Sequence, residues 1–324
     1  MAAQRWILLA AACFAAGLAS ADAPSVTFER GESELKIRSG DRVLARYVFQ
    51  DPTIARPYFT EVRALDGTQV TRHYPPREGV DATDHDTMHP GIWLAFGDIN
   101  GADFWRNKAR VVHEEFVGAF VEDVDRGAFT VRNRYMNGGD LVCEETCTAT
   151  IHVRTDGYFL LLESTFTSTH HPFTFGDQEE MGLGVRVATP LAVANGGRIL
   201  NSSGQENEAG CWGKPALWAN YGGAIDGKPV GITLMPHPGN FRPSWLHARD
   251  YGFVAANPFG RKAFTGGEPS RVEIAPGNPF RLAYGVYIYS RAEGDADPAK
   301  AYAEYLGLIH WPAPNPEGDA PHAE

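Results

Sequence analysis

Histidine, carboxylate and arginine side chains gather in three segments that interrupt the alternating pattern of this sequence. The first runs over residues 84–105 and contains His85 and His89. On a helix, this four-residue spacing would place both imidazoles on one face, which suits a metal ion or a proton-exchanging pair. Pro90 and Gly91 follow at once and favour an irregular loop leading into a strand at 92–96. We interpret the two residues as loop histidines that could still act as a pair. The alternative is that they make only ordinary hydrogen bonds.

The second segment, residues 175–187, places carboxylates just before a glycine-rich strand. Asp177 and Glu180 precede the strand, and Arg186 lies near its end. A carboxylate in this position can act as a general base, as an oxygen ligand for a metal, or as a partner for Arg186. The alternative is a salt bridge at the edge of a strand without any catalytic role.

The third segment, residues 237–260, is dense in hydrogen-bonding side chains: His237, His247, Arg249, Tyr251 and Asn257. Trp245 lies among them and offers a flat apolar surface. Sugars are bound in this way, with an aromatic face against the ring and polar groups on the hydroxyls. Trp212 and Trp218 could extend that surface, although a core position is the preferred interpretation for Trp218.

Composition and motifs exclude several function classes. The net charge is −11, and no cluster of Lys and Arg is present, which argues against a nucleic-acid partner. The sequence has no Gly-x-Ser-x-Gly elbow, no phosphate-binding Gly-Lys-Ser/Thr loop and no dinucleotide fingerprint. The protein therefore belongs to none of the classes that these motifs define.

Short runs of period two predict the elements that must position these segments. They lie at 26–30, 34–38, 42–48, 129–135, 148–153 and 281–289, with turn signals such as Asp66-Gly67 and Asp156-Gly157 between them. One helix is expected after Asp297, which can cap it, and Pro298, which suits its first turn. We predict an all-β protein: a large antiparallel β-sandwich in a single domain over residues 22–311, with long loops and one C-terminal helix. Residues 312–324 are expected to be disordered.

The N-terminus resembles a secretory signal. Arg5 precedes an apolar run, and small residues at 19–21 form a cleavage site. Cleavage after residue 21 changes the net charge from −11 to −12, because it removes Arg5 and no acid. We therefore expect an exported protein, periplasmic or extracellular, without a transmembrane segment, since the apolar run is shorter than the roughly 20 residues that span a membrane. A lipoprotein acylated at Cys13 is the alternative that we do not favour.

Three cysteines follow the expected cleavage site, so one thiol must stay unpaired in a monomer. Cys143 and Cys147 would lie about 13 Å apart in one extended strand, whereas a disulfide needs less than about 7 Å between Cα atoms. A bridge between them therefore requires a turn at 144–146. Pairing of either residue with Cys211 is equally open in an oxidising compartment.

Taken in order, the polar segments resemble a bacterial family of poorly defined function that carries the label "methane oxygenase PmoA family". The resemblance rests on motifs at 56–59, 71–76, 84–89, 97–105, 177–186, 212–221 and 237–260. The first loop departs from the family pattern by one inserted residue and by Pro90 in place of an arginine. A membrane oxygenase subunit needs several apolar spans that this sequence lacks, so we set the label's activity aside. What the resemblance implies is an association with sugar catabolism.

These observations predict an exported carbohydrate-active enzyme that acts on a glycoside or modified sugar by acid–base hydrolysis or elimination. The candidate catalytic residues are His85, His89, Glu180, His237 and His247. The candidate substrate-binding residues are Arg56, Tyr58, Arg249, Trp245, Tyr251 and Asn257. A divalent metal on His85, His89 and Glu180 is a further hypothesis, although their spacing is not diagnostic.

Two other functions use the same residues. A non-catalytic glycan-binding module would use the aromatic and polar groups only to hold an oligosaccharide. A structural envelope protein would use them only to fix its long loops. An enzyme predicts strongly shifted pKa values in a deep pocket, whereas a binding module predicts a shallow groove with exposed tryptophans. The sequence does not specify the oligomeric state.

Overall fold

The computed structural model describes residues 25–291 and 297–309. The expected signal peptide, Cys13 and the C-terminal tail lie outside these residues. Within the described part of the chain, no helix is both long and apolar enough to cross a membrane.

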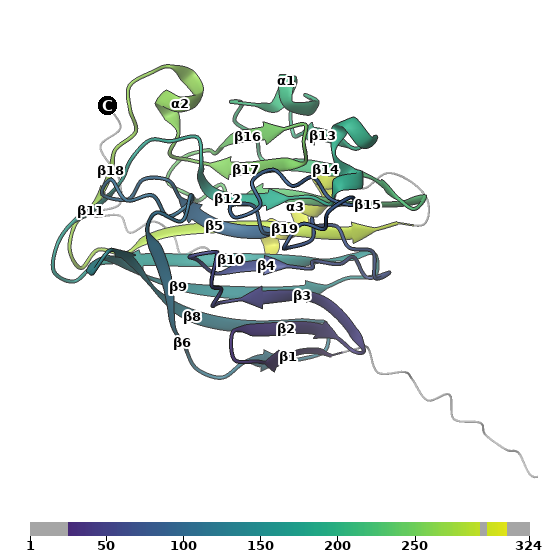
Figure 1. The fold of residues 1–324 in the computed structure, drawn as a ribbon, viewed down its shortest axis with the longest axis horizontal. Coiled ribbons are helices and arrows are strands. Elements are labelled where there is room, and N and C mark those ends of the chain that lie inside the picture. Colours follow the sequence, from purple (N-terminus) through teal and green to yellow (C-terminus); the bar gives the residue numbers. More distant parts are fainter. Residues whose placement is uncertain (1–24, 292–296, 310–324) are drawn as a thin grey trace, which may run out of the picture.

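Two large antiparallel sheets face each other (Figure 1). The eight-stranded sheet has the order β1 (Val26–Arg30), β2 (Glu34–Ser39), β3 (Arg42–Val48), β4 (Tyr58–Thr60), β5 (Ile92–Phe96), β12 (Met181–Arg186), β17 (Phe253–Asn257) and β16 (Trp245–Arg249). The second sheet has the order β13 (Arg198–Asn201), β14 (Ala219–Ile225), β15 (Lys228–Pro236), β19 (Phe280–Ser290), β10 (Gly157–Thr167), β9 (Asp140–Val153), β8 (Arg126–Asn137) and β6 (Arg110–Phe116), with β7 (Val121–Glu122) beside β8. The predicted β-sandwich is confirmed, and each predicted strand lies within one of these elements.

Smaller elements connect the sheets. A two-stranded sheet pairs β11 (Phe173–Phe175) with β18 (Val272–Ile274). Two 3₁₀ turns lie at Thr189–Leu191 and Val193–Asn195. The helices are α1 (Asn207–Cys211), α2 (Arg261–Thr265) and α3 (Pro298–Leu308).

The core between the sheets follows from side-chain alternation. Leu183 and Val185 of β12 point into it, as do Val254 and Ala256 of β17, and all four are at most 1 % exposed. Successive side chains in a strand point to opposite faces. The residues between them must therefore line the outer face of the eight-stranded sheet.

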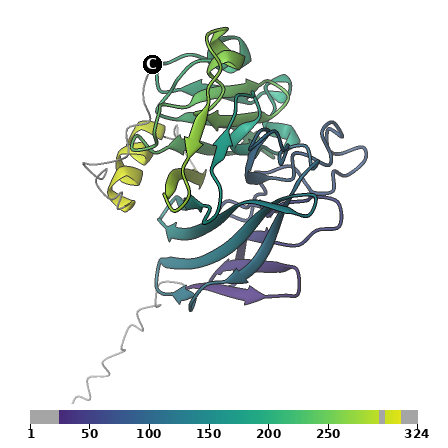
Figure 2. The same cartoon turned by 90° about the vertical axis from the view of Figure 1, so that its left-hand side faces the viewer.

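Helix α3 covers the outer face of the other sheet. Its Tyr305 is fully buried and lies over Gly285 of β19, where a Cβ atom would come within 2.6 Å of the ring. Asp297 accepts a hydrogen bond from the backbone N–H of Lys300, so the predicted helix and its cap are confirmed. Figure 2 shows α3 on one side of the molecule and the long loops of residues 50–110 on the other.

Those loops cover the middle of the eight-stranded sheet. Trp93 of β5 and Phe253 of β17 form a second buried cluster there with Trp105, which comes from the loop after β5. Gly184 of β12 lies beneath the two tryptophans, since a Cβ atom at this position would approach both indoles to within 2.9 Å. The glycine thus lets two large rings lie directly on the sheet, and these rings form the floor of the site described below.

The three cysteines are free thiols. Cys143 and Cys147 lie in the same strand, β9, without the turn that a bridge between them requires. Cys211 ends helix α1 and is buried. None of the three pairings considered from the sequence forms. The long strand keeps Cys143 and Cys147 extended and apart.

Candidate functional site

His85 and His89 lie in one short turn whose rings stack. The backbone N–H of His89 donates to the carbonyl of His85, and the ring centroids are 4.7 Å apart with an interplanar angle of 8°. His89 continues the stack onto Phe253 at 4.5 Å, and Tyr251 lies against His85 at 5.4 Å. His85 has a φ of 49°, a left-handed conformation that is uncommon outside glycine and often marks a functional position. The expected loop is confirmed.

Asp84 fixes the orientation of His85. One carboxylate oxygen lies 2.8 Å from Nδ1 of His85, and both oxygens accept hydrogen bonds of 2.7 Å from Arg186. Burial disfavours the ionised form of Asp84, but the hydrogen bonds from Arg186 and His85 outweigh it and hold the pKa of Asp84 well below its usual range. The imidazole of His85 is about one-third exposed. Its Nε2 therefore faces away from Asp84 and is available to a ligand.

Three arginines are buried behind this turn. Arg72 donates to the carbonyls of His85 and His89, and Arg56 donates to the carbonyls of Met88 and Trp105. Arg186 lies over the ring of Tyr251 at 4.6 Å. Burial lowers the pKa of Arg56 to about 9 and that of Arg72 to about 10, so both stay charged at neutral pH. Burial, reinforced by the same positive charges, holds the pKa of His89 well below its usual range.

His247 forms the other half of the site. It lies on the outer face of β16, and its ring meets Phe253 edge to face at 5.0 Å. Its Nδ1 lies 3.2 Å from the backbone carbonyl of Glu179, and its Nε2 lies 3.5 Å from the Glu179 carboxylate. Phe253 thus joins His247 to the stacked pair.

His247 is a neutral imidazole at physiological pH. Burial, and then the charge of Arg249, lowers its pKa to about 3. A carbonyl oxygen can only accept, so Nδ1 must carry the proton that it donates to Glu179, which leaves Nε2 as an acceptor. Nε2 and the Glu179 carboxylate are then two acceptors that face each other. A ligand hydroxyl or an acidic C–H bond placed between them would supply the missing proton.

The structure gives the two neighbouring glutamates, Glu179 and Glu180, other partners than the sequence predicted. Glu180 forms an ion pair with Arg106, and Glu179 is the carboxylate that faces His247 and Arg249. A second unforeseen acid is Glu208 of α1, which accepts from Arg249 at 2.9 Å. Two adjacent glutamates in a loop give no sign of which one faces a distant histidine, so the sequence pattern could not separate them.

Aromatic rings border the His247 side. The ring of Phe264 lies 6.0 Å from His247, 5.4 Å from Trp212 and 6.4 Å from Trp245. Arg249 lies 5.7 Å from the Trp212 ring. Trp245 and Trp212 are half-buried, so the aromatic surface predicted from the sequence is next to the polar site. Trp218 is not part of it, because it lies in the buried cluster under α3, which confirms the core interpretation.

Several predicted site residues have other positions. His237 lies near Tyr305 of α3, on the opposite side of the molecule from His85. Tyr58 is buried and donates to Asp51, and Arg56 is occupied by backbone carbonyls. Asn257 donates to the carbonyls of residues 178 and 179 and so positions Glu179 rather than a substrate. The structure brings together His85, His89, His247, Arg249, Tyr251 and Trp245, with Glu180 at the margin through Arg106.

The proposed metal ligands do not converge. Among the described residues, no three His, Cys, Asp or Glu side chains are grouped so that they could hold a metal ion. At His85 and His89 the reason is the parallel stacking, since the lone pairs of an imidazole lie in its ring plane and stacked rings cannot aim them at one point. The arrangement suits proton transfer better than metal binding.

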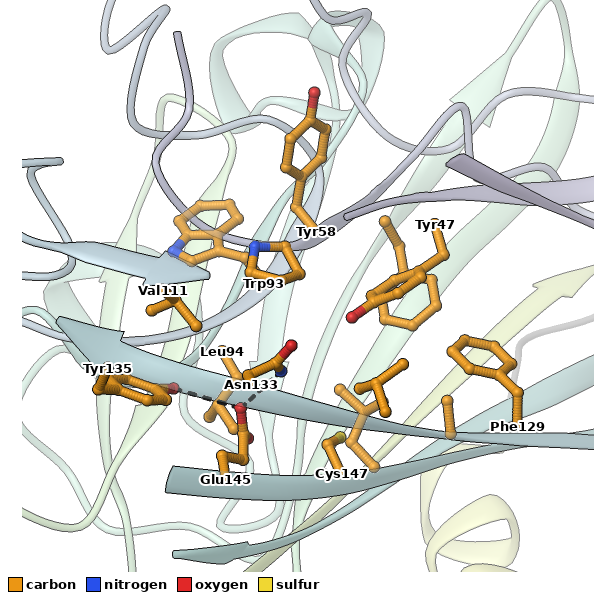
Figure 3. A pocket seen from close by; sticks show the side chains of 15 residues that line it. Tyr47, Tyr58, Trp93, Leu94, Val111, Phe129, Asn133, Tyr135, Glu145 and Cys147 are labelled. Atoms are coloured by element: carbon orange, nitrogen blue, oxygen red, sulfur yellow. Dashed lines mark hydrogen bonds between the residues drawn. The ribbon is translucent and has the colours of Figure 1, made fainter. Parts of the chain in front are cut away.

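A separate cavity of about 40 Å³ lies between the sheets beneath Trp93 (Figure 3). At its polar end Glu145 accepts hydrogen bonds from Asn133 at 3.0 Å and Ser164 at 2.7 Å, with Tyr135 at 3.5 Å. Ligand pockets for sugar-sized molecules have about 300 Å³ or more, so this space is too small for a substrate. It is large enough for a water molecule.

Replacing Glu145 with glutamine should stabilise the protein at alkaline pH relative to wild type. Burial, opposed in part by its three hydrogen bonds, raises the pKa of Glu145. A raised folded-state pKa means that wild type loses stability as the pH rises from the unfolded value of about 4.3 through the folded value. The amide has the same size and no charge to lose. Urea midpoints measured from pH 5 to 9 test this, and parallel curves for the two proteins would contradict it.

The protein should also lose stability as the pH falls, because His247 is buried as the neutral ring. Its pKa is about 3 when folded and about 6.5 when unfolded, so between these values only the unfolded chain binds the proton. The free energy of unfolding should fall by about 1.4 kcal/mol per pH unit for this residue as the pH drops below about 6.5. Urea midpoints at pH 7, 6 and 5 should therefore decrease less steeply for His247→Asn than for wild type. Equal slopes would show that the ring is protonated in the folded protein.

Comparisons with known proteins place the chain in a family without assigning it an activity. No curated protein matches the sequence significantly. Solved structures with a similar outline include galactose mutarotase-like proteins from Clostridium acetobutylicum (8 % identity, 83 % of this chain and 99 % of that chain, TM-score 0.37) and Lactobacillus casei (11 %, 82 % and 100 %, TM-score 0.34). A 4-alpha-glucanotransferase from Thermococcus litoralis matches with 8 % identity over 82 % of this chain and 39 % of that chain, with a TM-score of 0.34. Similarities this distant carry no argument about activity. Residues 34–304 match a family defined by sequence, and the chain therefore belongs to the family of unknown function DUF6807.

Proposed function

We propose that this protein is an exported enzyme that transfers protons to and from a glycoside or modified sugar and so cleaves it by hydrolysis or elimination. The observation that carries the proposal is the pair of oriented imidazoles. His85 is held by Asp84 with Nε2 free, and His247 is held by the Glu179 carbonyl with Nε2 as an acceptor. A proton donor and a proton acceptor held in fixed orientations are the elements of acid–base catalysis.

The two histidines have different partners. Nδ1 of His85 lies 2.8 Å from the carboxylate of Asp84, which orients the ring so that Nε2 can deliver a proton as a general acid. His247 is neutral, with the Glu179 carboxylate 3.5 Å from Nε2, which suits a general base. Asp84 acts as a positioning residue for His85, and Glu179 shares with His247 the proton that leaves the substrate.

The surrounding surface supports a sugar as the substrate. Trp212 and Trp245 border the His247 half, where an aromatic face can stack against a ring. Arg249 and Glu208 lie beside them and can bond to hydroxyl groups. Burial raises the pKa of Tyr251 to about 12, so its hydroxyl stays protonated and can also donate to a ligand.

A panel of glycosides and oxidised glycosides should be turned over by wild type and much more slowly by His85→Asn. Asparagine tolerates the left-handed backbone of residue 85, and its amide can keep the hydrogen bond to Asp84 while removing Nε2. The rate should fall about 100-fold or more. His170→Gln, at an exposed histidine outside the site, is the matched control and should keep full activity. Binding of glycans without turnover by any protein would instead indicate a binding module.

A further inference from the structure

Buried positive charge surrounds the His85 half of the site, and it specifies the kind of reaction. We infer that the substrate carries a carbonyl or carboxylate group next to the C–H bond that is broken, and that the reaction is an elimination through an anionic intermediate rather than a hydrolysis. The inference rests on the proposed function and makes its substrate class more specific.

The charge excess comes from Arg56, Arg72 and Arg186, which are at most 2 % exposed. Asp84 is the one carboxylate, among the described residues, within ion-pair distance of any of them. Asp81, Asp86 and Asp103 act on the arginines only at longer range, and each has partners of its own. Three guanidinium groups against one contacting carboxylate leave this wall positive.

The half of the site around His247 carries the opposite charge. Glu179 and Glu208 both form ion pairs with Arg249, and Glu180 forms an ion pair with Arg106. The acceptors at Glu179 and at Nε2 of His247 therefore lie on the negative side of the site. A proton that leaves the substrate would move toward the carboxylates, and the electrons left behind would face the arginines.

This polarity discriminates between the two reactions. Glycoside hydrolysis passes through a transition state with oxocarbenium character, which a buried positive wall destabilises. Elimination next to a carbonyl or carboxylate passes through an enolate, whose oxygen carries negative charge that the same wall stabilises. Buried charges act in a medium of low polarity and are little screened by salt.

The elimination balances without a further reactant. The His247–Glu179 pair removes the proton from the acidic carbon, and the electron pair moves onto the neighbouring oxygen as an enolate. The enolate then re-forms its carbonyl or carboxylate, a C=C bond forms, and the C–O bond at the next carbon breaks. His85 gives its proton to the departing oxygen. One saturated substrate yields an unsaturated sugar and an alcohol. The His247–Glu179 pair then releases its extra proton to solvent, and His85 takes one proton back from solvent.

Ligand binding tests the charge preference. By calorimetry, methyl β-D-glucuronide should bind at least about tenfold more tightly than methyl β-D-glucoside, and the cation 1-deoxynojirimycin should bind more weakly than either. The preference should persist at about 0.5 M NaCl, because exposed cations would be screened there and buried ones would not. Asp84→Asn should widen the preference by removing the one contacting carboxylate, whereas a purely structural effect would weaken both sugars equally. Equal affinities, or loss of the preference in salt, would overturn the inference.

Turnover separates this inference from the function on which it rests. Substrates deuterated at the carbon next to the carbonyl or carboxylate should react more slowly and release deuterium to solvent. Turnover with the deuterium retained, or tighter binding of 1-deoxynojirimycin than of glucuronide, would leave an acid–base enzyme but refute elimination. Failure to bind or turn over any sugar would refute the proposed function itself.

Discussion

Replacing His247 with asparagine should lower kcat/KM by about 100- to 10,000-fold, the usual contribution of a positioned acid or base. Asparagine can keep the hydrogen bond to the carbonyl of Glu179, and it removes only the nitrogen that faces the Glu179 carboxylate. The loss should fall mainly on kcat. Steady-state kinetics on a substrate found with the sugar panel, together with a urea denaturation curve, would measure activity and folding separately.

The adjacent glutamates supply a matched pair of controls. Glu179→Gln removes the carboxylate beside His247 and should lower kcat strongly. Glu180→Gln breaks the ion pair with Arg106, which contacts neither His85 nor His247, and should lower stability more than kcat. The reverse order of effects on kcat would show that Glu180, as predicted from the sequence, is the working carboxylate and that our assignment of Glu179 is wrong.

Replacing Asp84 with asparagine should destabilise the protein by about 3 kcal/mol, because it leaves the buried Arg186 without its carboxylate. Arg186 is 1 % exposed and holds both oxygens of Asp84 at 2.7 Å. Activity should fall as well, since His85 loses the group that orients its ring. Chemical denaturation and kinetics of the same preparation would measure both effects.

A double variant shows whether the unpaired charge causes the loss. Adding Arg186→Met to Asp84→Asn removes that charge, and the double variant should be more stable than Asp84→Asn alone. Additive losses would mean that the two side chains stabilise the loop independently. Activity should not recover in the double variant, because Asp84 would still be missing behind His85.

Several features of the fold could be predicted from the sequence because they depend on local patterns. Period-two runs such as 42–48 and 281–289 are strands, and Asp297 with Pro298 begins helix α3. The loop character of His85 and His89 followed from Pro90 and Gly91. The expected export signal and the resemblance to the PmoA-labelled family remain predictions.

The sequence alone determined which residues could do chemistry, since residue type and short spacing are written in it. The tertiary structure decided which of them meet. His237 and His247 are ten positions apart in the sequence. His237 follows a strand of one sheet and lies near Tyr305 of α3, whereas His247 lies in a strand of the other sheet beside Glu179. Glu208 and the buried arginines come to the site from distant segments, and no local pattern records such long-range packing. The polarity of the site is therefore a property of the fold, which brings those separate charges together.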